Sequence, residues 1–162
     1  MLEAEHAKSF AWALACCAYD RSDAEDVVQQ AYLRILDGRA TFAGRSAPRT
    51  WLFGVIWRCA REQRRRATVR RVLSGRVLVE LLSRAPEPVI DQLGSARDGL
   101  TIRRALRALS PNQREVIELV AYHDLTIEQA GRVLGMTAST ARTHYERAKR
   151  RLAAIIPTEK TA

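Results

Sequence analysis

The stretch LTIEQAGRVLGMTASTARTHYERAKRRL, from Leu125 to Leu152, decides the fold of the C-terminal part of this chain. Its apolar residues recur every three or four positions, which is the spacing of one buried helix face. Two such stripes flank Gly135: Ile127, Ala130, Val133 and Leu134 before it, and Ala141, Tyr145, Ala148 and Leu152 after it. The glycine between them predicts a tight turn. The stretch therefore predicts a helix-turn-helix.

The second helix of this motif has a polar and basic face opposite its apolar stripe. That face carries Thr140, Arg142, Thr143, Glu146, Arg147 and Arg150. Such side chains bind phosphates and base edges, and an arginine that contacts guanine discriminates between bases by roughly 1 to 3 kcal/mol. We expect Arg142 and Arg147 to act in this way in the major groove of DNA. Two roles stay open for Glu146, whose carboxylate either accepts a hydrogen bond from cytosine or repels a phosphate.

The whole chain is small and strongly basic. It has 162 residues, a formal net charge of +9 and 47% hydrophobic residues, which allows one or two small domains and no membrane span. The charge favours a polyanionic partner, although a membrane surface or an acidic protein would also attract it. Two clusters hold much of this charge: Arg58, Arg61, Arg64, Arg65, Arg66, Arg70 and Arg71, and then Arg142, Arg147, Lys149, Arg150 and Arg151. We therefore expect two contacts with one polyanion.

Cysteine spacing and the absence of catalytic motifs narrow the function further. Cys16, Cys17 and Cys59 lack the C-x-x-C spacing of a zinc site, so we expect reduced thiols that pack as small hydrophobes, and no metal or cofactor. Neither a Ser-His-Asp set nor a phosphate-binding glycine loop is present, which argues against an enzyme. The N-terminal residues do not form a secretory signal, so we expect a cytoplasmic protein.

Three helices are predicted in the N-terminal half. They run from Leu2 to about Tyr19, from Asp23 to about Leu36 and from Pro48 to about Arg66. Ser22 and Glu25 have the spacing of a capping box at the start of the second helix. The glycine-containing loop before Pro48 separates the second helix from the third.

Each of these helices is predicted to have one buried face. In the second helix it comprises Ala24, Val27, Val28, Ala31, Leu33, Ile35 and Leu36, and in the third Trp51, Leu52, Val55, Ile56 and Cys59. We expect Trp51 to be a core anchor, whereas core packing and DNA contact both stay open for Trp57. The opposite face of the second helix carries Asp26, Gln29, Gln30 and Arg34 and is a candidate partner surface. The arginine-rich third helix suits single-stranded nucleic acid.

Helical spacing weakens over residues 72–99 and returns from Leu100. We interpret this segment as a linker with a partly helical start at Val77–Leu82. Ser110 followed by Pro111 predicts a new helix start, and the next helix extends through Gln113 to Tyr122. No segment alternates like a strand. The predicted fold is thus all-α, with two small helical domains at 1–71 and 100–157 joined by the linker.

Two separated blocks of sequence carry a resemblance to a known family. The first is DAEDVVQQAYLRIL (23–36), then a loop, then PRTWLFGVIWRCAREQRRR (48–66). The second is LRALSPNQREVIELVAYHDLTIEQAGRVLGMTASTARTHYERAKRRL (106–152). They resemble regions two and four of the bacterial RNA polymerase sigma factors of the compact extracytoplasmic-function type. The helix-turn-helix alone also occurs in other regulators, but the two blocks in this order are specific.

The resemblance implies a function and a set of roles. It implies a protein that binds core RNA polymerase, directs it to promoters and helps to open the duplex. Polymerase docking would fall to Asp26, Gln29, Gln30 and Arg34. The minus-10 element would meet the loop Thr41–Ala47 and, from the loop and the third helix, Arg45, Ser46, Arg49, Arg58, Arg61 and Arg65. The minus-35 element would be read by Thr137, Ser139, Thr140, Arg142, Thr143, Glu146 and Arg147.

The resemblance also suggests an inhibitor protein, and one competing hypothesis stays open. A dedicated inhibitor protein, an anti-sigma factor, is common in this family and would have to be a separate chain. The competing hypothesis is a free-standing helix-turn-helix regulator that dimerises on duplex DNA through its N-terminal helices. Such a regulator would bind its site alone and protect two half-sites about one helical turn apart.

Overall fold

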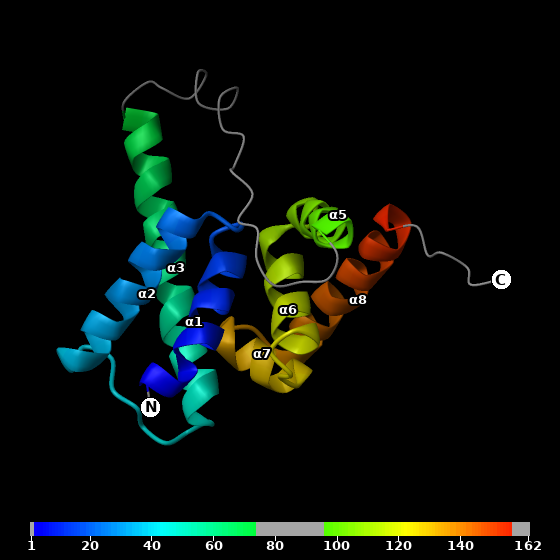
Figure 1. Cartoon of the computed structure of the whole chain (residues 1–162). Coiled ribbons are helices and arrows are strands. Elements are labelled where there is room, and N and C mark those ends of the chain that lie inside the picture. The colour runs from blue at the N-terminus through cyan, green and yellow to red at the C-terminus, as the bar shows by residue number, and fades with distance from the viewer. Residues whose placement is uncertain (1, 74–95, 157–162) are drawn as a thin grey trace. The chain divides into compact units, whose positions relative to one another are not determined.

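A computed structural model describes residues 2–73 and 96–156 of the chain (Figure 1). Within these two ranges the chain forms seven α-helices and no strand, which confirms the all-α prediction. The chain divides into two compact units, Met1–Val89 and Ile90–Ala162. No helix in the described ranges has the length and apolar character needed to cross a membrane.

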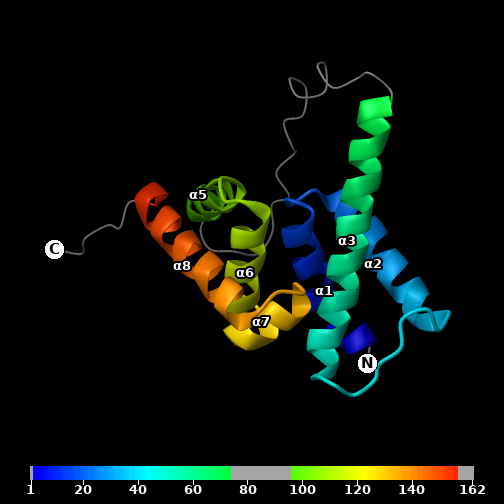
Figure 2. The same cartoon turned by 180° about the vertical axis from the view of Figure 1, so that it is seen from behind.

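The N-terminal unit packs three helices around one core. These are α1 (Leu2–Cys16), α2 (Arg21–Leu36) and α3 (Pro48–Leu73), and each of them contacts the other two (Figures 1 and 2). Trp12 and Phe53 are fully buried with their rings stacked at 6.0 Å between centroids. The indole N–H of Trp12 donates to the carbonyl of Phe53 at 3.1 Å, so the polar atom of this large core residue is satisfied.

The structure corrects the predicted ends of all three helices. Helix α1 stops at Cys16 rather than Tyr19, because Ala18 and Tyr19 have φ of 53° and 65° and cannot continue a right-handed helix. Helix α2 begins at Arg21, and its N-cap is Asp20, whose side chain accepts from the backbone N–H of Asp23 at 3.0 Å. Ser22 lies inside the first turn, so the capping box predicted there is wrong.

The third helix is longer than predicted. It continues past Arg66 to Leu73, because the arginine-rich segment contains good helix formers and no helix breaker. Residues 74–95, which hold most of the predicted linker and its helical start at Val77–Leu82, lie outside the described residues.

The buried faces of α2 and α3 match the prediction only in part. Ala24, Val27, Val28 and Ala31 are buried, but Leu33 and Leu36 are 49% and 73% exposed, so their predicted place in the core is wrong. Trp57 is 8% exposed and belongs to the core. Trp51, predicted as an anchor, is only half-buried and lies against Phe42 of the preceding loop, with 5.4 Å between ring centroids.

The C-terminal unit comprises four helices, α5 (Ala96–Arg107), α6 (Pro111–Ala121), α7 (Ile127–Val133) and α8 (Ala138–Ile155). Helix α8 packs against the other three. A core cluster of this unit comprises Leu109, Ile117 and Ala148, and Leu106, Tyr145 and Leu152 pack against it. The predicted second apolar stripe of the helix-turn-helix is thereby confirmed.

Local sequence explains where the helices of this unit begin. Ser110 caps α6 and shares a complete capping box with Gln113, as the Ser110-Pro111 start predicts. Thr126 and Gln129 form a second capping box at α7. Each box satisfies backbone N–H groups that would otherwise lack partners. After α7 the chain turns at Gly135, whose φ of +62° favours glycine, and the predicted turn is confirmed.

Candidate nucleic-acid interface

The first turns of α8 present a continuous polar surface. The seven residues predicted to read DNA are all exposed there: Thr137, Ser139, Thr140, Arg142, Thr143, Glu146 and Arg147. Ala141 and Ala148 on the other side of the helix are fully buried against the unit. Helix α8 is therefore held by one side and open on the other, which is the arrangement that lets a helix enter a major groove.

Hydrogen bonds order the start of this surface. Thr137 is the N-cap of α8, and its hydroxyl accepts from the backbone N–H of Thr140 at 3.2 Å. The hydroxyls of Thr137 and Thr140 also lie 2.9 Å apart, and the Thr143 hydroxyl donates to the carbonyl of Ser139 at 3.1 Å. These hydrogen bonds fix the orientation of the three threonine side chains at the N-terminal end of α8.

Two exposed ion pairs involve charged side chains of α8. Arg142 lies 3.6 Å from Glu128 of α7, and Glu146 lies 3.8 Å from Lys149 of α8 itself. Hydrogen bonds from its own backbone and from Thr126 lower the pKa of Glu128, and the charge of Arg142 lowers it further. Because both ion pairs are exposed, they break at little cost when another anion or a base approaches.

A close backbone approach sets the angle between α7 and α8. A Cβ atom at Gly131 would lie 2.9 Å from the backbone carbonyl oxygen of Met136, closer than real Cβ contacts allow. Gly131 is buried, and the N–H of Met136 donates to its carbonyl at 2.9 Å. A residue without a side chain is therefore required where the turn folds back on α7.

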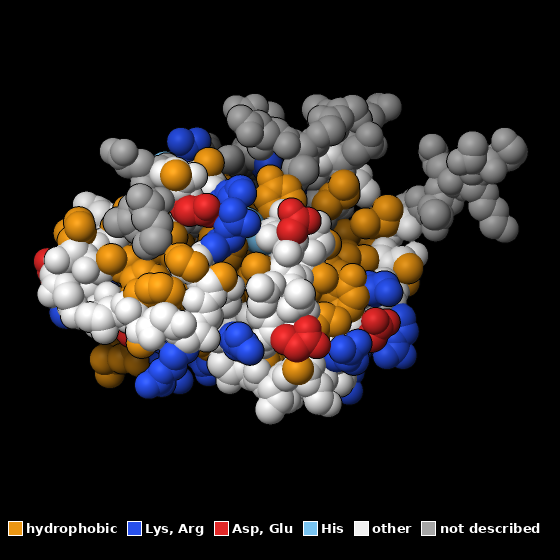
Figure 3. Space-filling view, turned by 90° about the horizontal axis from the view of Figure 1, so that it is seen from below, with side chains coloured by type: hydrophobic (Ala, Val, Ile, Leu, Met, Phe, Trp, Pro, Cys, Tyr) orange, Lys and Arg blue, Asp and Glu red, His pale blue; other side chains and the backbone are white. Residues whose placement is uncertain are grey.

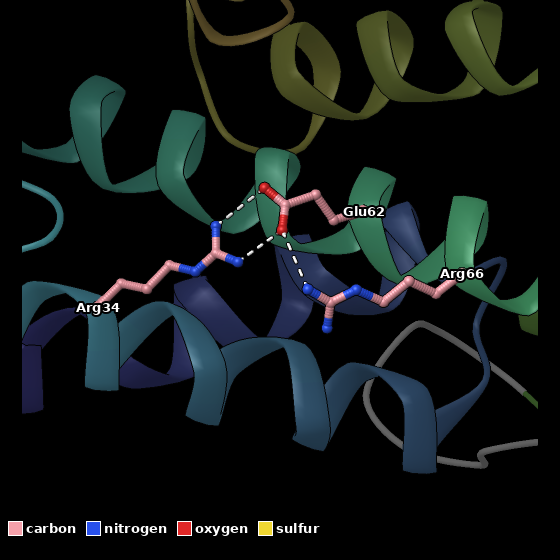
Figure 4. Close-up of polar contacts among 3 residues, drawn as sticks. All are labelled: Arg34, Glu62 and Arg66. Carbon is pink, nitrogen blue, oxygen red and sulfur yellow. Dashed lines mark hydrogen bonds and ion pairs between the residues drawn. The ribbon is translucent and has the colours of Figure 1, made fainter.

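In the N-terminal unit the proposed polymerase-docking residues differ in exposure. Asp26 and Gln29 are exposed on α2, whereas Gln30 is half-buried. Arg34 is also half-buried, and its two terminal nitrogens donate to the two carboxylate oxygens of Glu62 on α3, at 3.0 and 2.6 Å (Figure 4). The structure thus gives Arg34 a partner within its own unit.

The predicted minus-10 residues also divide into two groups. Arg45, Arg58, Arg61 and Arg65 are exposed, and Ser46 is half-buried. The guanidinium of Arg61 lies over the ring of Trp57, 5.0 Å from its centroid. Arg49 is half-buried and forms two hydrogen bonds to the carboxylate of Glu5 in α1, at 2.9 and 3.2 Å. Its guanidinium therefore links α3 to α1.

Sequence reasoning missed Glu5 and Glu62, the carboxylates that hold Arg49 and Arg34. Their partners are 44 and 28 residues away along the chain, so no local spacing reveals them. It also missed a groove between α2 and α3. The groove is lined by Asp23, Asp26, Gln30, Gln63, Arg65, Arg66, Val69 and Arg70. On the face shown in Figure 3, Lys and Arg side chains lie beside hydrophobic side chains.

Comparison with known families and proteins identifies the chain. The Sigma-70 region 2 family matches residues 3–70, and the Sigma-70, region 4 family matches residues 99–152. The sigma factor SigL of Mycobacterium tuberculosis is 31% identical over 129 residues, which cover 78% of this chain and 71% of that protein. The chain belongs to the extracytoplasmic-function sigma factors. SigX of Bacillus subtilis is 27% identical to this sigma factor and covers 79% of it, while the match spans 68% of SigX.

Solved structures share this fold. The sigma factor RpoE of Bartonella quintana, in complex with the anti-sigma factor NepR, matches with a TM-score of 0.78 and 23% identity over 98% of this chain and 96% of that one. CnrH, in complex with the cytosolic domain of CnrY, matches with a TM-score of 0.64 and 25% identity over 94% of this chain and 83% of CnrH. This chain is thus a sigma factor that directs RNA polymerase to promoters, and sigma factors are not enzymes. The dimerising regulator is not favoured.

Proposed function

We propose that α8 reads the minus-35 element, and that the loop and α3 of the N-terminal unit bind the minus-10 strand. The observation that carries the first part is the exposed polar surface of α8, which includes Arg142 and Arg147 and lies opposite a fully packed apolar side. In the proposed complex, each arginine contacts a guanine edge or a phosphate in the major groove.

For the minus-10 element, the proposed contacts are Arg45 and Ser46 in the loop and Arg58, Arg61 and Arg65 along α3. Extruding a base from the duplex costs on the order of a few kcal/mol, so a protein that helps to open a promoter needs a cationic surface for the displaced strand. The exposed arginines of α3 supply positive charge. Arg49 contributes by fixing α3 to α1 through Glu5 rather than by contacting DNA.

For polymerase docking, the proposed surface is the exposed side of α2 with Asp26, Gln29 and the half-buried Gln30. Arg34 belongs to this surface by position, although its guanidinium is engaged with Glu62. The proposed partner of this surface is core RNA polymerase in the cytoplasm.

An anti-sigma factor is a further proposed partner. RpoE of Bartonella quintana was solved with one, and CnrH was solved with the cytosolic domain of CnrY. Exposed apolar side chains such as Leu33, Leu36 and Phe42 are available on the N-terminal unit for such a protein.

Run-off transcription with core polymerase tests the proposal. Arg142→Ala is expected to reduce transcription from promoters with a minus-35 element while core binding stays unchanged. Asp26→Ala combined with Gln29→Ala is expected to reduce core binding itself. Arg104→Ala and Ser22→Ala serve as controls, because both residues are exposed in the same units and lie outside the proposed surfaces. If Arg142→Ala abolished core binding, the assignment of α8 to DNA would be wrong.

A further inference from the structure

Glu62 is a carboxylate on α3 that contacts guanidinium groups from two helices. It accepts two hydrogen bonds from Arg34 of α2, at 3.0 and 2.6 Å, and lies 4.0 Å from Arg66 one turn further along α3. Figure 4 shows Arg34 reaching across from α2 to both oxygens of Glu62, while Arg66 approaches one of them. The contact is bidentate, so it fixes direction as well as distance.

The contact favours the charged forms of both side chains. The hydrogen bonds from Arg34 hold the pKa of Glu62 below its ordinary value, and the charges of Arg34, Arg66 and Arg58 lower it further. The same pairing raises the pKa of Arg34. Both side chains are partly shielded from solvent, with 28% of Arg34 and 43% of Glu62 exposed.

The pair joins the two helices that carry the proposed surfaces of the N-terminal unit. On α2, Asp26 and Gln29 precede Arg34 by about two turns and just over one turn. On α3, Arg58 and Arg65 flank Glu62 at about one turn on either side. The bond between Arg34 and Glu62 therefore ties the C-terminal half of α2 to α3. Gln63 of α3 donates to Asp23 at 3.0 Å and ties the first turn of α2 to the same helix.

We propose that Glu62 is a positioning residue for polymerase docking, acting through Arg34 to hold the α2 surface in register with the basic side of α3. The inference rests on the proposed function of that surface and deepens it. Arg34 then supports the docking helix from within the unit, and Asp26, Gln29 and Gln30 contact polymerase.

Charge reversal separates this role from direct contact of Arg34 with polymerase. The test measures the Kd of the full chain for core polymerase with wild type, Glu62→Gln, Arg34→Glu, and the double variant Arg34→Glu, Glu62→Arg. Glu62→Gln is expected to weaken binding about threefold to tenfold, in the range of coupling between contacting groups. The double variant is expected to recover wild-type affinity to within about twofold, because the ion pair is restored with opposite polarity.

A matched control comes from α2 itself. Arg21 and Glu25 form an ion pair at 2.9 Å whose side chains are 63% and 57% exposed and lie within one helix. Glu25→Gln removes a carboxylate of the same kind without uncoupling α2 from α3, and is expected to leave the Kd unchanged. Thermal unfolding of every variant shows that binding is measured on folded protein.

Two results would overturn the positioning role. One is an unchanged Kd for Glu62→Gln; the other is a double variant that binds as weakly as Arg34→Glu alone, which would assign Arg34 to direct contact. Asp26→Ala with Gln29→Ala, measured in parallel, tests the docking surface itself. If that variant binds normally, the proposed surface is wrong and the positioning role falls with it. If it binds weakly while Glu62→Gln binds normally, only the role of Glu62 is lost.

Discussion

The arginines at the start of α8 differ from two arginines of the N-terminal unit in what their guanidinium groups contact. On α8, Arg142 and Arg147 are exposed, and the partner of Arg142 is an exposed carboxylate 3.6 Å away. In the N-terminal unit, Arg34 and Arg49 are half-buried and each forms two hydrogen bonds to one carboxylate of another helix. One residue type thus forms an outward surface on α8 and, at Arg34 and Arg49, holds helices together.

The difference teaches that a basic composition does not by itself locate a DNA surface. A bidentate pair between helices uses the fork of the guanidinium and leaves it less able to bind a phosphate. An exposed pair within reach of solvent is worth little and exchanges readily. Position in the three-dimensional structure, rather than the number of arginines, separates the two uses.

The largest expected effect is on promoter binding by α8. Replacing Arg142 and Arg147 together by alanine should weaken binding by about 1 to 3 kcal/mol for each base that the protein no longer contacts. The free energy of unfolding should change by less than about 0.5 kcal/mol, because both side chains are exposed. Fluorescence anisotropy of the holoenzyme on a promoter duplex and urea unfolding measure the two quantities. A decrease in stability as large as the decrease in binding would erase the contrast with Arg34 and Arg49.

Gly131→Ala sharpens the comparison by moving the reading helix without changing any charge. The new methyl group would meet the carbonyl of Met136 at 2.9 Å, and relief of that contact should destabilise the C-terminal unit by about 1 to 3 kcal/mol. Thermal unfolding of the full chain checks this. Arg132→Ala, an exposed change on the same helix, is the control and should leave unfolding almost unchanged. Equal stability of both variants would show that the turn tolerates a side chain.

Arg49→Ala is expected to lower stability and leave DNA binding almost unchanged, which is the reverse of what Arg142→Ala should do. Loss of the pair with Glu5 should lower the free energy of unfolding by about 0.2 to 1 kcal/mol, the range for partly exposed ion pairs. Affinity for a single-stranded minus-10 oligonucleotide in the holoenzyme should change little. Urea unfolding and a strand-binding assay measure these effects, with Arg45→Ala as the control that should weaken strand binding alone. A strand-binding defect in Arg49→Ala at unchanged stability would return Arg49 to the DNA surface.

The smallest effect concerns pH. Arginine partners lower the pKa of Glu5 and of Glu62 in the folded protein below the ordinary value of 4.5. Each pair therefore adds stability above pH 4.5 that is lost as the pH falls through the lowered folded-state pKa. The free energy of unfolding in urea should be higher for wild type than for Glu62→Gln at pH 7, by about 1 kcal/mol or less, and the gap should close in acid. A gap that stays constant from pH 7 to pH 3 would contradict the ion pair.

Much of the C-terminal unit could be predicted because its signals are local. The start of α6 at Ser110-Pro111, the turn at Gly135 and the buried stripe of α8 each depend on residues a few positions apart. Likewise, the exposed set on α8 follows from the same period that buries Ala141 and Ala148.

The N-terminal unit was harder to predict because its decisive features are not local. Ser22 was predicted to cap α2, but Asp20, which is also a good N-cap residue, caps it in the structure. Leu33 and Leu36 have apolar side chains, but the helices that cover Val27 and Val28 do not cover them. Arg34 and Glu62 are 28 residues apart, so only folding brings the two together.

Helix α7 has seven residues, or about two turns. A segment this short does not hold its form in water by itself, since closing the first turn is unfavourable and few residues remain to offset that cost. Helix α7 therefore forms only while it is packed against α6 and α8, and it unfolds together with them. Loss of packing in this unit is therefore expected to remove α7 and its contacts with α8 in a single step.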